Sequence, residues 1–159
     1  MKSTEVIAKE LVRTLKEKGL TIATAESITA GGLAAAITEI SGSSAVFLGG
    51  TIAYSDAIKT KILGVPKRLI TKHSAVSEEV ALAMATAVRA EFKSDFAIST
   101  TGVAGPGKAY GKKAGTVWIA IVSKSTQQAI ALDISGDRAT VRHATIESAL
   151  AAFSRILSA

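Results

Sequence analysis

The sequence predicts an α/β protein in which helices cover both faces of a mixed, mostly parallel sheet of about five strands, a three-layer α/β/α arrangement. Helical segments alternate with short apolar strands along most of the chain. Two strands near the C-terminus are joined by a short polar turn, so one strand is expected to run antiparallel. With 159 residues, 48% of them hydrophobic, the chain fits one domain over residues 1–159.

The first half of the chain is expected to hold three helices and two strands. Apolar side chains recur on one face of a helix over residues 4–18, which Gly19 ends. A short buried strand and a second helix follow, and a Ser-Gly-Ser-Ser turn closes that helix. Next come a strand whose two glycines predict a close approach of backbone or ligand, and a brief helix capped by Ser55 or Asp56. These four elements cover residues 20–24, 33–40, 47–55 and 55–64.

The second half begins with a loop after Pro66, in which His73 is expected to lie. Two glutamates in the first turn favour a helix over residues 77–92, because the helix dipole attracts negative charge there. A buried strand, a long loop rich in glycine, a two-stranded hairpin and a last helix complete the chain. They cover residues 96–100, 101–115, 116–122 with 128–134, and 138–157.

Composition and charge exclude several classes of function. The chain has no cysteine, which excludes disulfides, thiolate metal sites and a cysteine nucleophile. The charged N-terminus lacks the apolar centre of a signal peptide and no run could span a bilayer, so we expect a cytoplasmic protein that binds no membrane. The net charge of +6 is best explained by solvated surface, next by a phosphorylated ligand, and least by nucleic acid, because few aromatics accompany the basic residues.

Polar residues gather where the predicted strands end. In open α/β sheets ligands bind at the carboxyl ends of the strands, so these residues form a candidate site. They are Glu26, Ser27 and Thr29 after the first strand; Tyr54, Ser55 and Lys59 at the end of the second; Thr100, Thr101 and Gly102 after the third; and Ser135, Asp137 and Arg138 after the last.

A hydroxyl, a lysine, a tyrosine and an arginine in one cleft indicate acyl transfer without a metal. The two histidines, His73 and His143, lie far apart in sequence and form no helical pair, so neither a metal site nor a Ser-His-Asp triad is favoured. Ser27 activated by Lys59 fits better, provided that a dry site lowers the pKa of the lysine. The alternatives are that Ser27 is a helix cap and that Lys59 is an exposed helix residue.

Six separated blocks of the sequence closely resemble the C-terminal domain family of the competence-damage-inducible protein CinA. The blocks are TAESITAGGLAAAITEISGSSAVF, IAYSDAIKTKILGV, HSAVSEEVALAMA, STTGVAGP, GTVWIAI and SGDRATVR. The resemblance runs from about Glu5 to the last helix. It implies an amidohydrolase that converts nicotinamide mononucleotide to nicotinate mononucleotide and ammonia in pyridine nucleotide recycling. It also implies a homodimer that needs no cofactor.

The resemblance also assigns roles to residues. It implies that Ser27 is the nucleophile, Lys59 its base and Tyr54 a supporting residue. It associates Ser44, in the Gly-Ser-Ser turn, with the oxyanion. Substrate-binding roles fall on Thr101 and Arg138, with Arg142 a close second, and the strand-end pattern adds Thr29 and Gly102 to that group. Glu26 is expected to brace the turn by hydrogen bonds rather than to act as a base.

Two departures from the family pattern leave other functions open. Ala30 stands where glycine is common, and the loop over Gly105–Gly115 lacks the family's double glycine and proline. The altered loop leaves open the same amidase chemistry on another amide. A separate alternative is a catalytically silent paralog that binds a nucleotide or a protein. The pyrophosphatase-like domain of two-domain relatives is absent from the sequence, so we expect no such activity.

Overall fold

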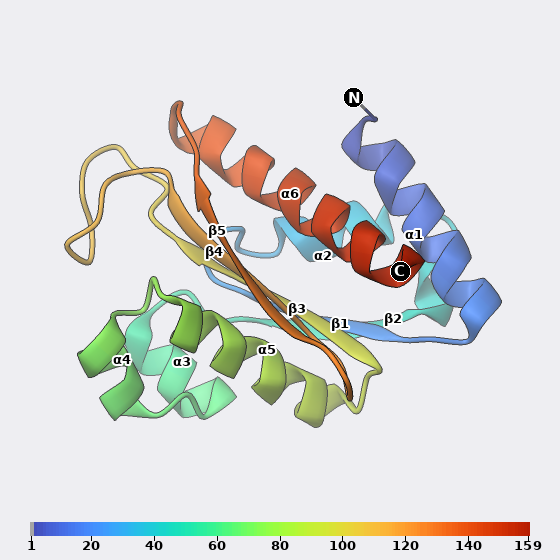
Figure 1. The fold of residues 1–159 in the computed structure, drawn as a ribbon, viewed down its shortest axis with the longest axis horizontal. Coiled ribbons are helices and arrows are strands. Elements are labelled where there is room, and N and C mark those ends of the chain that lie inside the picture. The colour runs from blue at the N-terminus through green and yellow to red at the C-terminus, as the bar shows by residue number, and fades with distance from the viewer. Residues whose placement is uncertain (1) are drawn as a thin grey trace.

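The computed structural model describes residues 2–159, which form one five-stranded sheet between two layers of helices (Figure 1). The strand order is β2–β1–β3–β4–β5. Strand β1 pairs in parallel with β2 and β3, whereas β4 is antiparallel to β3 and to β5. Only β4 therefore runs against the other four, which confirms the predicted mixed sheet. The strands are β1 (Ile22–Glu26), β2 (Phe47–Ile52), β3 (Phe96–Gly102), β4 (Thr116–Val122) and β5 (Gln127–Asp133).

The helices divide between the two faces of the sheet (Figure 1). One face carries α1 (Thr4–Lys18), α2 (Gly32–Thr38) and α6 (Arg138–Ser158), and the other carries α3 (Asp56–Leu63), α4 (Lys67–His73) and α5 (Glu78–Phe92). A single 3-10 turn, η1 (Ser43–Ala45), precedes β2. No helix within residues 2–159 combines the length and the apolar content that crossing a membrane requires.

Local sequence signals explain most helix boundaries. The hydroxyls of Ser3, Ser55 and Ser77 accept hydrogen bonds from the first turns of α1, α3 and α5. Gly19 and Gly64 end α1 and α3 in the left-handed conformation that glycine adopts without steric cost.

Helix α4 was not predicted from the sequence, which indicated a loop containing His73 at these residues. The segment has seven residues, and its two apolar side chains, Leu69 and Ile70, are too few to show a helical period. Pro66 precedes its first residue, a position that proline tolerates because no helical N–H is needed there.

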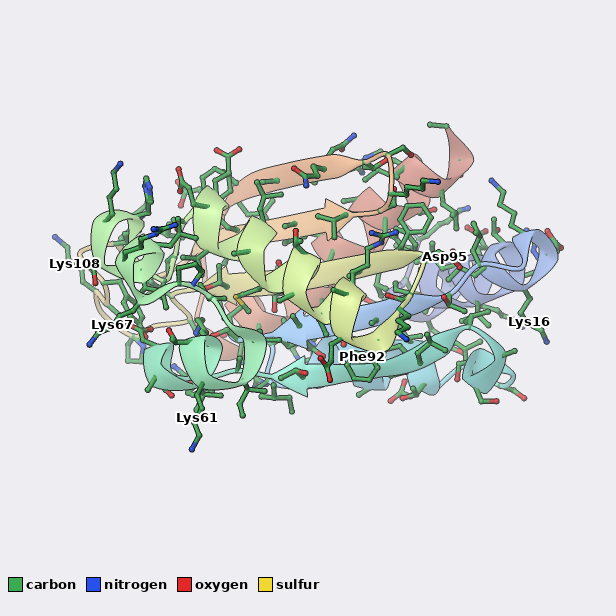
Figure 2. The ribbon with its side chains drawn as sticks, turned by 90° about the horizontal axis from the view of Figure 1, so that it is seen from below. Lys16, Lys61, Lys67, Phe92, Asp95 and Lys108 are labelled. Atoms are coloured by element: carbon green, nitrogen blue, oxygen red, sulfur yellow. The ribbon has the colours of Figure 1, made fainter. Side chains whose placement is uncertain are left out.

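Two hydrophobic cores lie on opposite sides of the sheet. Leucine, isoleucine and Phe153 fill the core beneath α1, α2 and α6, whereas alanine, valine and Met84 fill the core beneath α5. The predicted close approach at the β2 glycines is also present. A Cβ on Gly49 would strike the ring of Phe92, which Figure 2 labels, and one on Gly50 would strike Thr24. This packing fixes β1, β2 and β3 with their carboxyl ends at one edge.

Candidate active site

A cavity of about 250 Å³ opens where β1, β2 and β3 end. Its wall contains six of the residues that the sequence singled out: Ser27, Tyr54, Lys59, Thr101, Gly102 and Arg138. The volume lies just below the range of about 300–1,000 Å³ typical of sites for drug-sized ligands. The cavity therefore suits a ligand at the small end of that range.

Ser27 and Lys59 form a buried pair at the bottom of this site. The Nζ of Lys59 donates a hydrogen bond to the Oγ of Ser27 at 2.8 Å, and the exposed fractions are 1% for Lys59 and 7% for Ser27. The same Nζ lies 3.4 Å from the carbonyl oxygen of Tyr54. Because the cap at Ser55 fixes the first turn of α3, the lysine side chain enters the cavity from a rigid element.

The environment of Lys59 favours the neutral amine. Burial lowers the pKa of Lys59 because water no longer solvates the charged form. The carboxylate of Asp56 acts in the opposite direction, although its effect is the smaller of the two. A neutral amine at hydrogen-bond distance from a hydroxyl can take its proton, which is the arrangement that a Ser-Lys nucleophile needs.

The turn that carries Ser27 is held from inside by Glu26. The buried carboxylate of Glu26 accepts hydrogen bonds from the backbone N–H groups of Leu33 and Ala34, at 2.8 and 3.0 Å. It also accepts one from the hydroxyl of Thr29 at 2.6 Å. These contacts confirm that Glu26 braces the turn.

The predicted substrate-binding roles of Thr29 and Arg142 need correction. The hydroxyl of Thr29 is buried between Glu26 and Thr100, so it does not face the cavity. The guanidinium of Arg142 donates to the carbonyl oxygens of Ile28 and Thr29, at 3.2 and 3.1 Å, and lies outside the cavity wall. Both residues hold the turn, and neither lines the cavity.

Ser44 is not brought to the cavity by a single chain. It lies in η1, which precedes β2, whereas the cavity lies beyond the last residue of β2. Since β1 and β2 are parallel and paired along their length, Ser44 stands at the opposite edge of the sheet from Ser27. Within one chain, Ser44 is therefore not placed to contact an oxyanion at Ser27.

Arg138 joins two parts of the cavity rim. Its guanidinium donates to the hydroxyl of Tyr54 at 2.9 Å and to the carbonyl oxygen of Gly105 at 2.6 Å. Asp137 caps α6 through the N–H of Thr140 and so fixes where the helix starts. Because Arg138 is exposed and uses only part of its five N–H donors in these contacts, it can still bind an anion.

Sequence reasoning missed the far wall of the cavity. The segment between α4 and α5 contributes Ala75 and Val76, whose carbonyl oxygens accept hydrogen bonds from Thr101 at 2.7 Å and Lys112 at 2.6 Å. Tyr110, from the loop between β3 and β4, completes the wall. No strand-end pattern points to these residues, because they come from a connection and a loop.

The two histidines take no part in the site. His73 pairs with Glu79 at 3.5 Å, and His143 lines a separate depression with Arg142. Within residues 2–159, no group of three or more histidine, aspartate or glutamate residues is arranged to hold a metal ion.

Comparison with protein families and curated proteins gives consistent matches. The model of the CinA C-terminal domain matches residues 4–157. The CinA-like protein of Citrifermentans bemidjiense is 46% identical over 147 residues, which are 92% of this chain and 36% of that protein. A putative competence-damage inducible protein of Desulforudis audaxviator is 41% identical over 147 residues, with the same coverage. The chain thus spans about a third of the length of the curated relatives it matches.

Solved structures share the fold over nearly the whole chain. The competence damage-inducible protein A from Klebsiella pneumoniae has a TM-score of 0.96 and 34% identity, covering 99% of this chain and 98% of its own. A CinA superfamily protein from Escherichia coli has a TM-score of 0.93 and 32% identity, covering 99% of this chain and 91% of its own.

Proposed function

The chain belongs to the CinA C-terminal domain family, and we propose that it is an amidohydrolase that converts nicotinamide mononucleotide to nicotinate mononucleotide and ammonia. The observation that supports this most directly is the contact of 2.8 Å between Lys59 Nζ and Ser27 Oγ at the bottom of the cavity. A buried amine beside a hydroxyl serves acyl transfer, and a carboxamide is the acyl donor that the family resemblance implies.

The proposed reaction has two steps. Lys59, in its neutral form, takes the proton of Ser27 as Oγ attacks the carboxamide carbon. The resulting ammonium of Lys59 then protonates the nitrogen as the C–N bond breaks, so that ammonia leaves and an ester to Ser27 remains. Water attacks this ester with Lys59 again as base, which releases the carboxylate product and restores the serine.

We assign the oxyanion to the backbone that follows Ser27. Ile28 lines the cavity, and within residues 2–159 its backbone N–H donates to no protein acceptor. A donor next to the nucleophile can stabilise the negative charge of a tetrahedral intermediate, a contribution typically worth about 3–4 kcal/mol. The contacts of Glu26 and Arg142 hold this turn before the substrate arrives.

The charge around the cavity favours an anionic substrate such as a mononucleotide. Arg138 and Lys108 stand on the rim. Figure 2 shows that Lys61, Lys67 and Lys108 lie at one end of the molecule, with Lys16 at the other. Positive charge gathered near a cleft raises the local concentration of anions and their rate of encounter.

The test is ammonia release from nicotinamide mononucleotide by purified protein. Ser27→Ala is expected to lower kcat by a factor on the order of 10⁴ or more, because the nucleophile is lost. Ser125→Ala is the matched control, since Ser125 is an exposed serine in the β4–β5 turn. Unchanged release in Ser27→Ala contradicts the proposed nucleophile, and no release by the unaltered protein contradicts the proposed activity.

A second candidate is an amidase of the same mechanism that acts on a different amide. The observation that favours it is the loop between β3 and β4, which forms part of the cavity wall and departs from the family pattern. Release of ammonia from another carboxamide, abolished by Ser27→Ala, would support this candidate.

A further inference from the structure

The loop between β3 and β4 contains a small hairpin with Tyr110 at its tip. Ala109 and Lys112 exchange two backbone hydrogen bonds, of 3.0 and 2.9 Å. The two residues between them, Tyr110 and Gly111, have φ angles of 55° and 70°. Positive φ at both central positions is characteristic of a type I′ turn.

The backbone conformation of Tyr110 is unusual for its residue type. Non-glycine residues rarely adopt positive φ, and those that do are most often asparagine or aspartate. A bulky residue in this region costs free energy and persists where its surroundings hold it, which is often at functional sites. A glycine at position 110 would relieve this strain, so the tyrosine is better explained by what its ring contacts.

Three contacts hold the loop over the cavity. Lys112 donates to the carbonyl oxygen of Val76 at 2.6 Å, and Lys113 pairs with Asp133 at 3.0 Å. On the other side, Arg138 donates to the carbonyl oxygen of Gly105. The hairpin is thus fixed to the α4–α5 segment, to β5 and to the start of α6.

The ring of Tyr110 stands in the cavity wall with part of its surface open. Tyr110 and Tyr54 both line the cavity that contains Ser27 and Lys59, and their exposed fractions are 48% and 55%. Arg138 holds the hydroxyl of Tyr54 at 2.9 Å. Two half-exposed aromatic residues in the wall of the same cavity offer apolar faces to a flat ligand.

Tyr110 lies within the electrostatic influence of Asp56 on α3. Burial raises the pKa of the Tyr110 phenol, and the negative charge of the nearby Asp56 carboxylate raises it further. The Oδ1 atom of Asp56 is buried and has no hydrogen-bond partner within residues 2–159.

From this geometry we propose that Tyr110 is a substrate-binding residue that selects amides whose carbonyl is attached to a flat aromatic ring. The inference rests on the proposed function, because it names how that site would recognise the pyridine ring. Tyr110 binds the ring by stacking, whereas Arg138 in the same cavity wall meets the phosphate. The altered loop is then the element that sets selectivity.

Tyr110→Gly is the sharpest variant, since glycine suits the backbone conformation and removes only the ring. We expect an unchanged or higher Tm, a KM for nicotinamide mononucleotide about tenfold higher, and a kcat within about twofold, because stacking on an aromatic side chain contributes about that much. Tyr110→Phe keeps the ring and should keep KM within about threefold. Lys124→Ala, at an exposed position between β4 and β5 and outside the cavity wall, is the control.

Binding measured in a Ser27→Ala background separates this inference from the proposed activity. Tyr110→Gly should weaken binding of nicotinamide mononucleotide about tenfold and leave binding of ribose 5-phosphate, which lacks the ring, unchanged. An unchanged KM and affinity, or equal weakening of both ligands, overturns the inference. A selective loss of affinity in a protein that releases no ammonia supports the inference and contradicts the activity. Absence of both binding and turnover overturns both.

Discussion

Lys59 lies one helical turn after Asp56 on α3. Burial lowers the pKa of the Lys59 amine, and the negative charge of the nearby Asp56 carboxylate partly opposes that change. The two effects set the fraction of Lys59 that is neutral at a given pH. Because only the neutral amine can accept the Ser27 proton, the balance between burial and Asp56 governs the pH at which the site becomes active.

The pH dependence of kcat/KM should show this balance. We expect kcat/KM to rise with pH and to level off above the pKa of Lys59, falling about tenfold for each pH unit below it. Asp56→Asn removes the negative charge that raises this pKa, so the rising limb should move to lower pH. Steady-state kinetics between pH 5 and pH 10 measure the profile.

The control for this prediction is Glu91→Gln, which removes an exposed carboxylate outside the cavity wall. Its rising limb should coincide with that of the unaltered protein. A limb that moves to higher pH in Asp56→Asn, or does not move, contradicts the role given to Asp56.

The pKa of Lys59 also predicts how stability varies with pH. In the unfolded chain this pKa is near 10.5, and in the folded chain it is lower. Between the two values the unfolded chain binds more protons, so the free energy of unfolding rises with pH across that window. Lys59→Met removes this dependence.

Relative to the unaltered protein, Lys59→Met should therefore be most favoured at low pH. Its advantage in the free energy of unfolding should shrink as the pH approaches 10.5. The variant also loses the contact to Ser27, which changes its free energy of unfolding by an amount that does not vary with pH. The prediction therefore concerns the slope of the free-energy difference against pH. Urea titrations at several pH values measure it. Lys61→Met, at an exposed position of the same helix, should show no such slope.

Local signals predicted the fold well, because they determine where most elements start and stop. Helix α1 was predicted to the residue from its apolar face and from Gly19. The first strand was placed two residues too early, because Glu26 looked like a strand end although it is buried within β1. Polar residues that are satisfied inside a sheet cannot be distinguished by sequence pattern from those that follow it.

The candidate site was predicted in part, and the errors share a physical cause. Strand-end reasoning gathered Ser27, Tyr54 and Lys59 correctly, since parallel strands bring their carboxyl ends together. It could not show that Arg142 contacts backbone carbonyls, because the position of a residue on a helix does not determine which neighbouring groups its long side chain reaches. It also could not supply Tyr110, whose position depends on a turn conformation that a tyrosine rarely adopts.

Ser44 provides a test between the family resemblance and the geometry of one chain. Because Ser44 lies at the opposite edge of the sheet, Ser44→Ala should keep kcat/KM within about twofold of the unaltered value, as surface substitutions usually have small effects. Ammonia release measures this. A large loss of kcat at unchanged Tm would contradict the prediction and would mean that a second copy of the chain supplies Ser44 to the site.

The two arginines near the start of α6 should differ in what they bind. Arg138 stands on the cavity rim, so Arg138→Ala should raise the KM for nicotinamide mononucleotide by about 10- to 100-fold, which is the effect of losing a charge-assisted hydrogen bond. Nicotinamide riboside lacks the phosphate, and its kcat/KM should change little in the same variant. Arg142→Ala should instead lower kcat for both compounds by a similar factor, because the guanidinium holds the carbonyls of Ile28 and Thr29. If Arg142→Ala alone discriminates between the two compounds, the phosphate lies on the Arg142 side of the turn and the assignment to Arg138 is wrong.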